Sequence, residues 1–385
     1  MSEAGVDIEI LDVAYGGDGV GRLPDGRTAF VPFTAPGEQV RVRIAGLHRR
    51  FVRAELVEVL AASPARVVPR CPLYGRCGGC RYQHVTDALE SGLKAKQVQD
   101  LLARVGHLVS PPAPELPAAD VATWGYRNKV TVNPGPGDGF LGYYALDNRT
   151  VLPVKACPIA MAPINAALQH GLRARQPVTF RCDAAGKVHR VGRRTPPVTE
   201  TLLGRELQVP ADGFYQVHPP VLDALVRWLG ERLGGRGELI DAYCGVGVFA
   251  LGLGGAFERV LGLEADADSV EWARRNAAAW GLAQAMFEVA AVEERLLEMA
   301  AVPPPAAGRT VLLDPPRGGC EKAVLAALQR HPPAQLVYVS CNPAMLARDL
   351  ARLGVGVGWR LAHLAVFNMF PQTAQFETVA ILARV

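Results

Sequence analysis

The pattern of apolar and polar residues divides the chain into three stretches of different character. Residues 6 to about 60 form short apolar-alternating runs broken by turns such as Gly16–Gly19. Strands of this length and spacing predict a small β-barrel. From about 121 to 211 the pattern is again strand-like, with a predicted hairpin over 139–154. Between these stretches, helical spacing predicts a helix over 87–106, and the proline-rich residues 110–119 are expected to form a linker or surface loop.

The last third of the chain changes to short apolar runs that end in polar residues and alternate with alanine-rich helical stretches. This alternation predicts a parallel sheet of the α/β class. Two final apolar runs, 360–370 and 376–385, flank Pro371 and predict a terminal β-hairpin on that sheet.

A chain of 385 residues is too long for one ordinary core, so we expect several domains. The expected division is a β-barrel over 1–62, a central α+β domain over 63–211 and a Rossmann-like α/β domain over 212–385. There is no apolar run of about 18 residues and no signal-peptide pattern at the start. We therefore expect a cytoplasmic protein without a membrane partner.

A candidate cofactor loop follows one predicted strand of the last third. Gly245 and Gly247 would let the backbone turn tightly and approach a ligand, and Glu264, at the end of the next strand, could accept both ribose hydroxyls. The third glycine of the dinucleotide pattern is missing, which favours S-adenosylmethionine over a nicotinamide cofactor. Asp314 ends a further strand and should face the same crevice. A purely structural strand-turn-helix is the alternative.

Two residues are candidates for chemistry. Cys341 lies in Val-Ser-Cys-Asn-Pro at the end of a predicted strand, and Glu377 opens the terminal strand. Taken singly, the cysteine fits a buried packing residue and the glutamate a solvated strand end.

The eight cysteines do not suggest a disulfide scaffold, because three of them lie close together in a chain expected in a reducing compartment. Cys71, Cys77 and Cys80 form this cluster, and Cys157 could supply a fourth thiolate. Such a set suits zinc or an iron-sulfur cluster, and spacing does not decide between them. The remaining cysteines are expected to be packing residues: Cys182, Cys244 and Cys320.

A local basic segment is more informative than the net charge of +4. Five arginines occur between residues 41 and 53 with no carboxylate among them, which indicates either a nucleic-acid surface or a solvated basic face. They are Arg41, Arg43, Arg49, Arg50 and Arg53.

Several motifs together resemble the class I S-adenosylmethionine-dependent RNA uracil-5 methyltransferase family over nearly the whole chain. They are Phe-Tyr-Gln-Val-His (214–218), Asp-Pro-Pro-Arg (314–317), Ser-Cys-Asn-Pro (340–343) and residues 370–382, with a TRAM-like, OB-like barrel and the cysteine cluster. The resemblance implies Cys341 as nucleophile and Glu377 as base. It also implies cofactor contacts by Gln216, Tyr243, Gly245, Glu264 and Asp314, and a [4Fe-4S] cluster on the four cysteines, with zinc as the alternative.

The barrel combined with the cysteine cluster resembles the branch of the family that acts on 23S rRNA, with tRNA as the rival substrate and a monomer as the expected state. Residues 126–129 resemble the family's central motif that approaches nucleic acid, although a strand with a solvated edge would look the same. Three positions depart from the family: Val248 for asparagine, Gln375 for histidine and His218 for asparagine. They leave the nucleophile and the base unaffected.

The chemistry explains why a cysteine and a base would be paired. Carbon 5 of uracil is a poor nucleophile, and addition of a thiolate at carbon 6 activates it. A base must then remove the carbon 5 proton. Arg317 and Asn342 are candidates to stabilise the thiolate. Two other readings stay open: a non-catalytic RNA-binding iron-sulfur protein, and a methyltransferase acting on cytosine or a small molecule.

Overall fold

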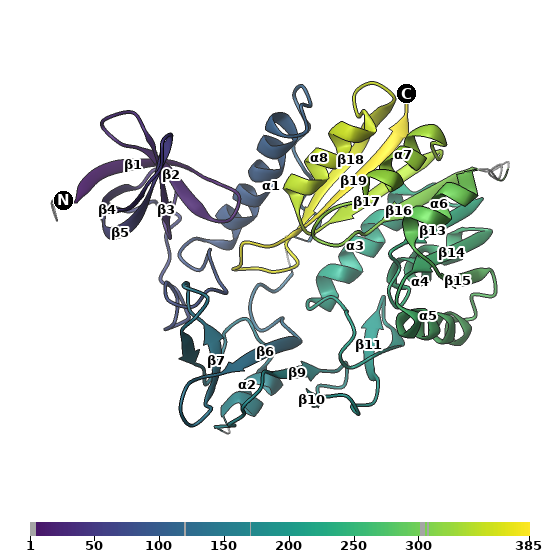
Figure 1. Cartoon of the computed structure of the whole chain (residues 1–385), viewed down its shortest axis with the longest axis horizontal. Helices are drawn as coiled ribbons and strands as arrows, with labels where there is room; N and C mark the ends of the chain where they lie inside the picture. Colours follow the sequence, from purple (N-terminus) through teal and green to yellow (C-terminus); the bar gives the residue numbers. More distant parts are fainter. Residues whose placement is uncertain (1–4, 119–120, 170, 301–304, 306–307) are drawn as a thin grey trace. The chain divides into compact units, whose positions relative to one another are not determined.

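The computed structural model describes residues 5–118, 121–169, 171–300, 305 and 308–385 (Figure 1). The chain folds into two compact units. The first, here called the barrel unit, contains the chain up to Gln97, Ala122–Val178 and Phe370–Gln375. The second, the sheet unit, contains Val98–Val121, Thr179–Met369 and Phe376–Val385. The chain therefore passes from one unit to the other several times.

The first five strands close into a barrel in the order β1-β2-β3-β5-β4, as predicted. Their bounds are β1 Val6–Val13, β2 Asp18–Arg22, β3 Thr28–Pro32, β4 Gln39–Leu47 and β5 Phe51–Ala61. Alternate residues of each strand point inward, because successive side chains of a strand lie on opposite faces. The barrel core is therefore built from small and branched apolar side chains, among them Ile8, Ile10, Ala29, Val31, Val40, Val42 and Val52.

The rest of the barrel unit contains the predicted helix and the predicted hairpin. Helix α1 spans Asp87–Arg104, and its residues up to Gln97 belong to this unit. Strands β6 (Lys129–Pro134), β7 (Leu141–Tyr144) and β8 (Val151–Pro153) pair antiparallel in that order, which confirms the hairpin. Helix α2 follows at Ala162–Gln169.

After α2, β9 (Val178–Cys182) and β10 (Val188–Val191) pair antiparallel as a first hairpin, within a five-stranded sheet of order β10-β9-β6-β7-β8. Strands β11 (Val198–Leu202) and β12 (Arg205–Val209) form a second, two-stranded hairpin. The second hairpin is fixed to a helix further along the chain. The side chain of Asn276 accepts from the amide of Gln208 at 2.9 Å and donates to its carbonyl at 2.9 Å. This residue therefore acts like an added strand partner for β12.

A seven-stranded sheet in the order β15-β14-β13-β16-β17-β19-β18 forms the centre of the sheet unit. The strands β13 to β17 are parallel, and β19 runs antiparallel between β17 and β18. The predicted parallel sheet and terminal hairpin are thus confirmed. The bounds are β13 Glu238–Ala242, β14 Arg259–Glu264, β15 Ala285–Val289, β16 Arg309–Leu313, β17 Gln335–Ser340, β18 Trp359–Phe367 and β19 Glu377–Arg384.

Helices cover both faces of this sheet. The strand order reverses between β15 and β16, and right-handed crossovers then place the helices before and after the reversal on opposite faces. One group, α3 to α5, packs together, as does the other, α6 to α8 (Figure 1). Their bounds are α3 Pro219–Arg232, α4 Val248–Leu253, α5 Ala267–Trp280, α6 Val292–Ala300, α7 Lys322–Arg330 and α8 Pro343–Leu353, with a short 3-10 turn, η1, at Gly254–Ala256. No helix in the described ranges has the length and apolar character to cross a membrane.

The proline-rich stretch 110–118 is a loop, as predicted, but it is fixed rather than free; residue 119 lies outside the described ranges. The backbone of Glu115 donates to the carbonyl of Leu364 at 2.8 Å and accepts from the amide of Val366 at 2.9 Å. Its carboxylate accepts from the indole of Trp228 and the guanidinium of Arg232. The loop thereby pairs with the outer edge of β18, where free backbone groups would invite association.

Candidate active site

Five residues predicted from sequence lie at one edge of the sheet. Glu264 ends β14, while Asp314 and Cys341 directly follow β16 and β17. Because these strands are parallel, their carboxyl ends meet at the same edge. Glu377 is the first residue of β19, which runs the opposite way, so its amino end lies at that edge too. Tyr243, just after β13, completes the group. The strand reversal lies here, and open α/β sheets bind ligands at such a point.

Cys341 and Glu377 face each other across two neighbouring strands. In the β17–β19 ladder, Ser340 is paired with Thr378. Cys341 follows the first and Glu377 precedes the second, so continuing the antiparallel register by one residue places them opposite one another. Side chains in such positions have β-carbons about 4.5–5.5 Å apart. Consistent with this, the charge of Glu377 raises the pKa of the Cys341 thiol.

Burial raises the pKa of two carboxyl groups at this edge, those of Glu377 and Asp314. Glu377 is buried, and its pKa lies well above the usual range because of desolvation, with a further increase from the charge of Asp314. A hydrogen bond from Gln216 and the charge of Arg317 oppose this effect. Burial also raises the pKa of Asp314 to about 7. A carboxylate destabilised in this way is a stronger proton acceptor than an exposed one.

The thiol of Cys341 is partly exposed, whereas Cys182, Cys244 and Cys320 are buried, as predicted for packing residues. Burial, together with the nearby carboxylates of Glu377 and Asp314, raises the pKa of this thiol to about 11. The guanidinium of Arg317 has the opposite effect, through its charge and a hydrogen bond to the thiol. Arg317 is therefore the group placed to stabilise the thiolate.

Asn342 does not stabilise the Cys341 thiolate, the role expected from the sequence, but has a structural role. Its side-chain oxygen accepts from the amides of Ala344 and Met345 and so caps the amino end of α8. Its side-chain nitrogen donates to the carbonyl of Arg317 at 3.1 Å. Asn342 thus holds the backbone of Arg317, and its side-chain hydrogen bonds do not go to the thiol.

The two glycines of the loop after β13 have different surroundings: Gly245 borders open space, and Gly247 is tightly packed. Gly245 has a φ of 52°, and a β-carbon added there would meet nothing within 4 Å, so the backbone borders open space. Gly247 has a φ of 88°, and an added β-carbon would lie 3.1 Å from the ring of Phe287. The first glycine leaves room for a ligand, and the second lets the loop pack on the sheet. Val248, one of the departures from the family, is the first residue of α4.

Glu264 is held in place by three backbone amides. It accepts from Gly245 at 3.1 Å, from Ala265 at 2.7 Å and from Asp266 at 3.0 Å. Tyr243 has a positive φ of 67°, which is strained for a residue with a side chain. Its hydroxyl is hydrogen-bonded to the buried thiol of Cys320. Both side chains are therefore fixed before any ligand arrives.

Three buried oxygen atoms at this edge have no hydrogen-bond partner among the described residues: Gln216 Oε1, Asp241 Oδ1 and Glu377 Oε2. Buried polar atoms are nearly always paired, so these oxygens indicate missing ligand or solvent contacts. Asp241 was not predicted as a separate site residue. Its other oxygen accepts from Ala250, and burial raises its pKa to about 8. The available signal was a carboxylate inside β13, a strand that is otherwise fully buried and apolar beyond its first residue.

A buried ion pair positions the segment that leads to Gln216. Arg181 and Glu200 pair at 2.9 Å with almost no exposure. The same guanidinium donates to the carbonyls of Pro210, Ala211 and Gly213. His218, another departure from the family, is buried at the amino end of α3.

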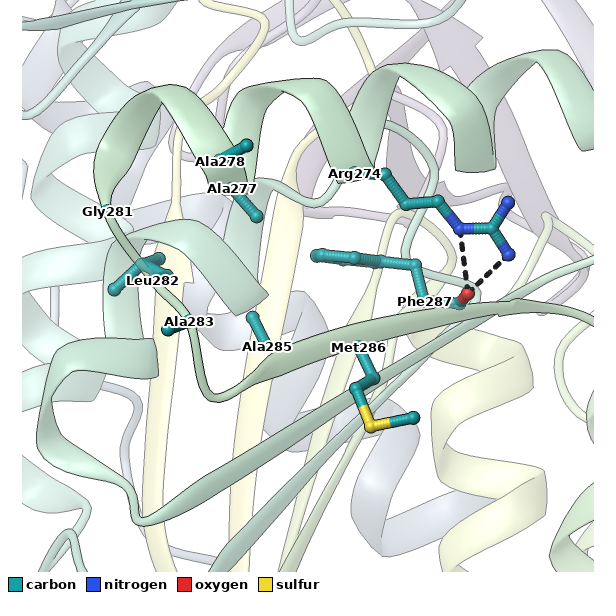
Figure 2. A pocket seen from close by; sticks show the side chains of 9 residues that line it. All are labelled: Arg274, Ala277, Ala278, Gly281, Leu282, Ala283, Ala285, Met286 and Phe287. Atoms are coloured by element: carbon teal, nitrogen blue, oxygen red, sulfur yellow. Dashed lines mark hydrogen bonds between the residues drawn. The ribbon is translucent and has the colours of Figure 1, made fainter.

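Figure 2 shows the side chains that line a hollow between the end of α5 and β15. The guanidinium of Arg274 donates twice to the carbonyl of Phe287, at 3.1 Å and 2.7 Å. It thereby blocks part of an exposed strand edge. The hollow is lined largely by apolar residues and begins at the amino end of β15, so it is separate from the catalytic edge.

In the barrel unit, the four predicted metal-ligand cysteines influence one another. Burial, together with the charges of Cys157, Cys77 and Cys71, raises the pKa of Cys80 to about 12. Cys157 is fixed by Asn165, which accepts from its amide at 2.8 Å and donates to its carbonyl at 3.1 Å. In the part of the chain that the structure describes, no group of three or more ligand side chains is arranged to hold a metal ion.

Several arginines of the basic segment of the barrel form ion pairs within the protein, so fewer of them are available to bind RNA than the sequence indicates. Arg41 pairs with Asp7 at 2.8 Å and with Glu58 at 3.3 Å. Arg43 pairs with Glu55 at 2.6 Å, and Arg53 lies 3.9 Å from Asp18. The segment itself holds no carboxylate, but carboxylates from other strand positions pair with three of its five arginines. Arg49 and Arg50 occupy the β4–β5 turn, beside the stacked rings of His48 and Phe51.

Two side chains of the 126–129 motif are buried. Tyr126 is 6% exposed and donates to the carbonyl of Pro371 at 2.9 Å, and Asn128 is 3% exposed. Arg127 and Lys129 are partly exposed. A surface role could therefore involve only the two basic residues.

Comparisons with known proteins agree with the motifs. The profile of the family described as tRNA (Uracil-5-)-methyltransferase matches residues 202–385, and that of the TRAM domain matches residues 4–57. An uncharacterized RNA methyltransferase of Thermosynechococcus vestitus is 33% identical, over 98% of each chain. The 23S rRNA (uracil(1939)-C(5))-methyltransferase RlmD of Chromohalobacter salexigens is 32% identical, over 99% of this chain and 89% of that protein.

Among solved structures, the tRNA (uracil-54, C5)-methyltransferase of Pyrococcus abyssi, determined with S-adenosyl-L-homocysteine, superposes with a TM-score of 0.75. The match covers 98% of this chain and 99% of that one at 22% identity, and so shows a shared fold. Together, the barrel, the seven-stranded sheet and relatives that align along almost its full length show that the chain belongs to the family of RNA uracil-5 methyltransferases.

Proposed function

We propose that the protein transfers a methyl group from S-adenosylmethionine to carbon 5 of a uridine in RNA, with Cys341 as nucleophile and Glu377 as base. The observation that carries the proposal is the facing position of these two residues beside an open crevice. Carbons 6 and 5 of uracil are adjacent atoms. A thiol and a carboxyl group on neighbouring strands can therefore act on the same ring.

The reaction would proceed in two parts. The Cys341 thiolate adds to carbon 6, and the electron pair of the carbon 5–carbon 6 double bond moves into an enolate. Carbon 5 then takes the methyl group, for which S-adenosylmethionine is the donor and S-adenosylhomocysteine the product. Glu377 next removes the proton from carbon 5, and the electrons of that bond restore the double bond as the Cys341 sulfur leaves.

The crevice has the groups that a sulfonium nucleoside would require. Glu264 is fixed at the end of β14, where its carboxylate can accept ribose hydroxyls. Gly245 borders open space, and Gln216 has an unpartnered buried oxygen. Asp314 adds negative charge that favours a cationic sulfur, and Tyr243 would form part of the wall. We propose these five residues as cofactor contacts.

Large-subunit ribosomal RNA is the proposed substrate. It is favoured by the RlmD relative and by the barrel combined with four cysteines. The target uracil must leave its stack to reach Cys341, so a loop or distorted helix suits the site better than a regular duplex. Arg49 and Arg50 would contact phosphates and raise affinity without selecting the base.

Residues 1–62, 63–211 and 212–385 remain the proposed division into an RNA-binding barrel, a central domain and a catalytic domain. In the central domain, we propose that Cys71, Cys77, Cys80 and Cys157 hold a [4Fe-4S] cluster. Four thiols from two segments, whose charges affect one another, supply the number of ligands that such a group requires. A single zinc ion would bring the sulfurs within about 4 Å of one another, given Zn–S bonds of about 2.3 Å. The cluster would have a structural role, because methyl transfer involves no electron transfer.

Methyl transfer can be tested directly with purified protein, isotopically labelled S-adenosylmethionine, 23S rRNA and tRNA. The expected result is 5-methyluridine at a defined position of 23S rRNA, located by mass spectrometry. Modification of tRNA alone would show that tRNA, and not ribosomal RNA, is the substrate. Label in cytosine or in a small molecule, or no transfer to any RNA, would overturn the proposal.

A further inference from the structure

The segment that leads into Glu377 belongs to the barrel unit, although Glu377 itself belongs to the sheet unit. Residues Phe370–Gln375 are packed within the barrel unit, and the chain returns to the sheet unit at Phe376. Only one residue, Phe376, separates Gln375 from the proposed base. The position of Glu377 is therefore set by the pairing of β19 with β18 on one side and, through the covalent chain, by what holds this short segment on the other.

Gln372 is the most constrained residue of the segment. It is 1% exposed and has a positive φ of 70°, a strained conformation for a residue with a side chain. Its amide donates to both carboxylate oxygens of Glu90, at 2.9 Å and 3.1 Å. Its carbonyl accepts from the amides of Arg81 and Tyr82, at 2.8 Å and 3.0 Å. Such strain persists only where several contacts impose it.

A fully buried ion pair on α1 holds the same segment from a second side. Glu90 and Lys94 are both 0% exposed, and their charged atoms are 2.6 Å apart. The ammonium of Lys94 also donates to the carbonyl of Gln375 at 3.2 Å. A buried ion pair adds little net stability, because desolvation offsets the attraction. Its hydrogen bonds at both ends of Gln372–Gln375 suggest that it instead fixes the conformation of this segment.

Two further contacts complete the attachment. The hydroxyl of Tyr126 donates to the carbonyl of Pro371 at 2.9 Å, and Asp87 accepts from the side chain of Gln372 at 2.8 Å. Arg81 directly follows Cys80, so the cysteine loop is also bonded to the segment.

We propose that the Glu90–Lys94 pair and Gln372 are positioning residues that set the place of Glu377 for the removal of the carbon 5 proton. This inference rests on the proposed function. Displacement of a reacting group by about 1 Å can reduce a rate by about 100-fold. Addition of Cys341 and methyl transfer do not use Glu377, so loosening the segment should slow only the release of methylated RNA.

The test compares the two half-reactions in the double variant Glu90→Gln/Lys94→Met, which removes both charges and keeps side-chain size. With 5-fluorouridine RNA, formation of the trapped adduct should stay within about twofold of the wild-type rate. With ordinary RNA, release should slow by about tenfold or more, so that a methylated covalent adduct accumulates.

A matched control is the Glu38→Gln/Arg66→Met variant, which removes an ion pair with a buried carboxylate in the same unit. That pair makes no described contact with Phe370–Gln375, so the ratio of adduct to product should not change even if the melting temperature falls. Equal slowing of both half-reactions in the Glu90/Lys94 variant, or an unchanged ratio, would overturn the inference.

Tyr126→Phe provides a milder variant if the double variant does not fold. Loss of one hydrogen bond to Pro371 should shift the ratio in the same direction by about threefold. An unchanged ratio in folded Tyr126→Phe would count against the inference. Failure of wild-type protein to form any adduct with 5-fluorouridine RNA would instead refute the proposed function, so the two failures can be told apart.

Discussion

Cys341, directly after β17, and Glu377, the first residue of the adjacent antiparallel strand β19, occupy opposed positions at the edge of the sheet where the parallel strands end. The antiparallel insertion of β19 creates this relationship. A parallel strand in the same place would bring its carboxyl end, not its amino end, to this edge. The terminal hairpin therefore serves the site, because it delivers a carboxyl group to a crevice otherwise lined by strand ends.

The reactivity of Cys341 should respond in opposite directions to two substitutions. Arg317 lowers the pKa of the thiol, whereas Glu377 raises it. Below the pKa of about 11, alkylation increases with the thiolate fraction. Arg317→Ala should therefore slow alkylation at pH 8 by about tenfold, and Glu377→Gln should accelerate it. Peptide mass spectrometry after timed iodoacetamide treatment measures the rate at Cys341. Equal rates in wild type and Arg317→Ala would exclude Arg317 as the stabilising group.

The buried carboxyl of Asp241 should make stability depend on pH. Its pKa is raised to about 8 in the folded protein, above that of an unfolded aspartate. The folded state then binds more protons than the unfolded state between about pH 4 and pH 8, so stability falls as pH rises through this window. One such group contributes a slope of up to about 1.4 kcal/mol per pH unit.

Asp241→Asn keeps an acceptor for the amide of Ala250 and removes the titration. Its advantage over wild type in urea unfolding should grow from pH 5 to pH 8. A constant difference across that range would mean that Asp241 does not titrate as described.

RNA binding should depend on the arginines of the β4–β5 turn more than on their ion-paired neighbours. Arg49→Ala/Arg50→Ala should weaken binding several-fold and reduce the slope of log affinity against log salt by about 1 to 2. Arg43→Ala is the control, since its partner Glu55 already neutralises it. Fluorescence anisotropy over a salt series measures both quantities. Equal losses of affinity in the two variants would mean that RNA binds at another surface or contacts the whole barrel without preference for this turn.

The four cysteines should hold iron in anaerobically purified protein. Cys80→Ser is expected to lose the iron and the visible absorption and to melt at a lower temperature, because metal binding contributes to folding. Cys182→Ser, at a buried packing position, should retain both. Iron and sulfide analysis with absorption spectra provides the measurement. A colourless wild-type protein with one bound zinc would refute the cluster.

Local patterns in the sequence were sufficient to predict the barrel, the parallel sheet and the edge of that sheet that carries the site, but they missed helix α2 in a stretch predicted as strands. Alternation with period two marks the barrel strands, and polar residues after apolar runs mark Glu264, Asp314 and Cys341. These features depend on neighbouring residues in the chain. They could therefore be found without knowledge of the tertiary fold.

The contacts that sequence reasoning missed join residues far apart in the chain. Arg41 is neutralised by Asp7, 34 positions away, and Gln372 is held by Glu90, 282 positions away. Asn342 was expected near the thiol but caps α8, a competing use that its position before Pro343 favours. Neither spacing nor composition predicts the Arg41 and Gln372 contacts, since they arise only when distant strands and helices pack together.

The most direct test uses Glu377→Gln protein, ordinary uridine RNA and S-adenosylmethionine, followed by denaturing electrophoresis and peptide mass spectrometry. If Glu377 resolves the covalent intermediate, methylated RNA should remain bound to the peptide that contains Cys341, and Cys341→Ala should abolish the band. Rapid turnover by Glu377→Gln without any adduct, or an adduct on a different residue, would contradict the proposed pairing of nucleophile and base.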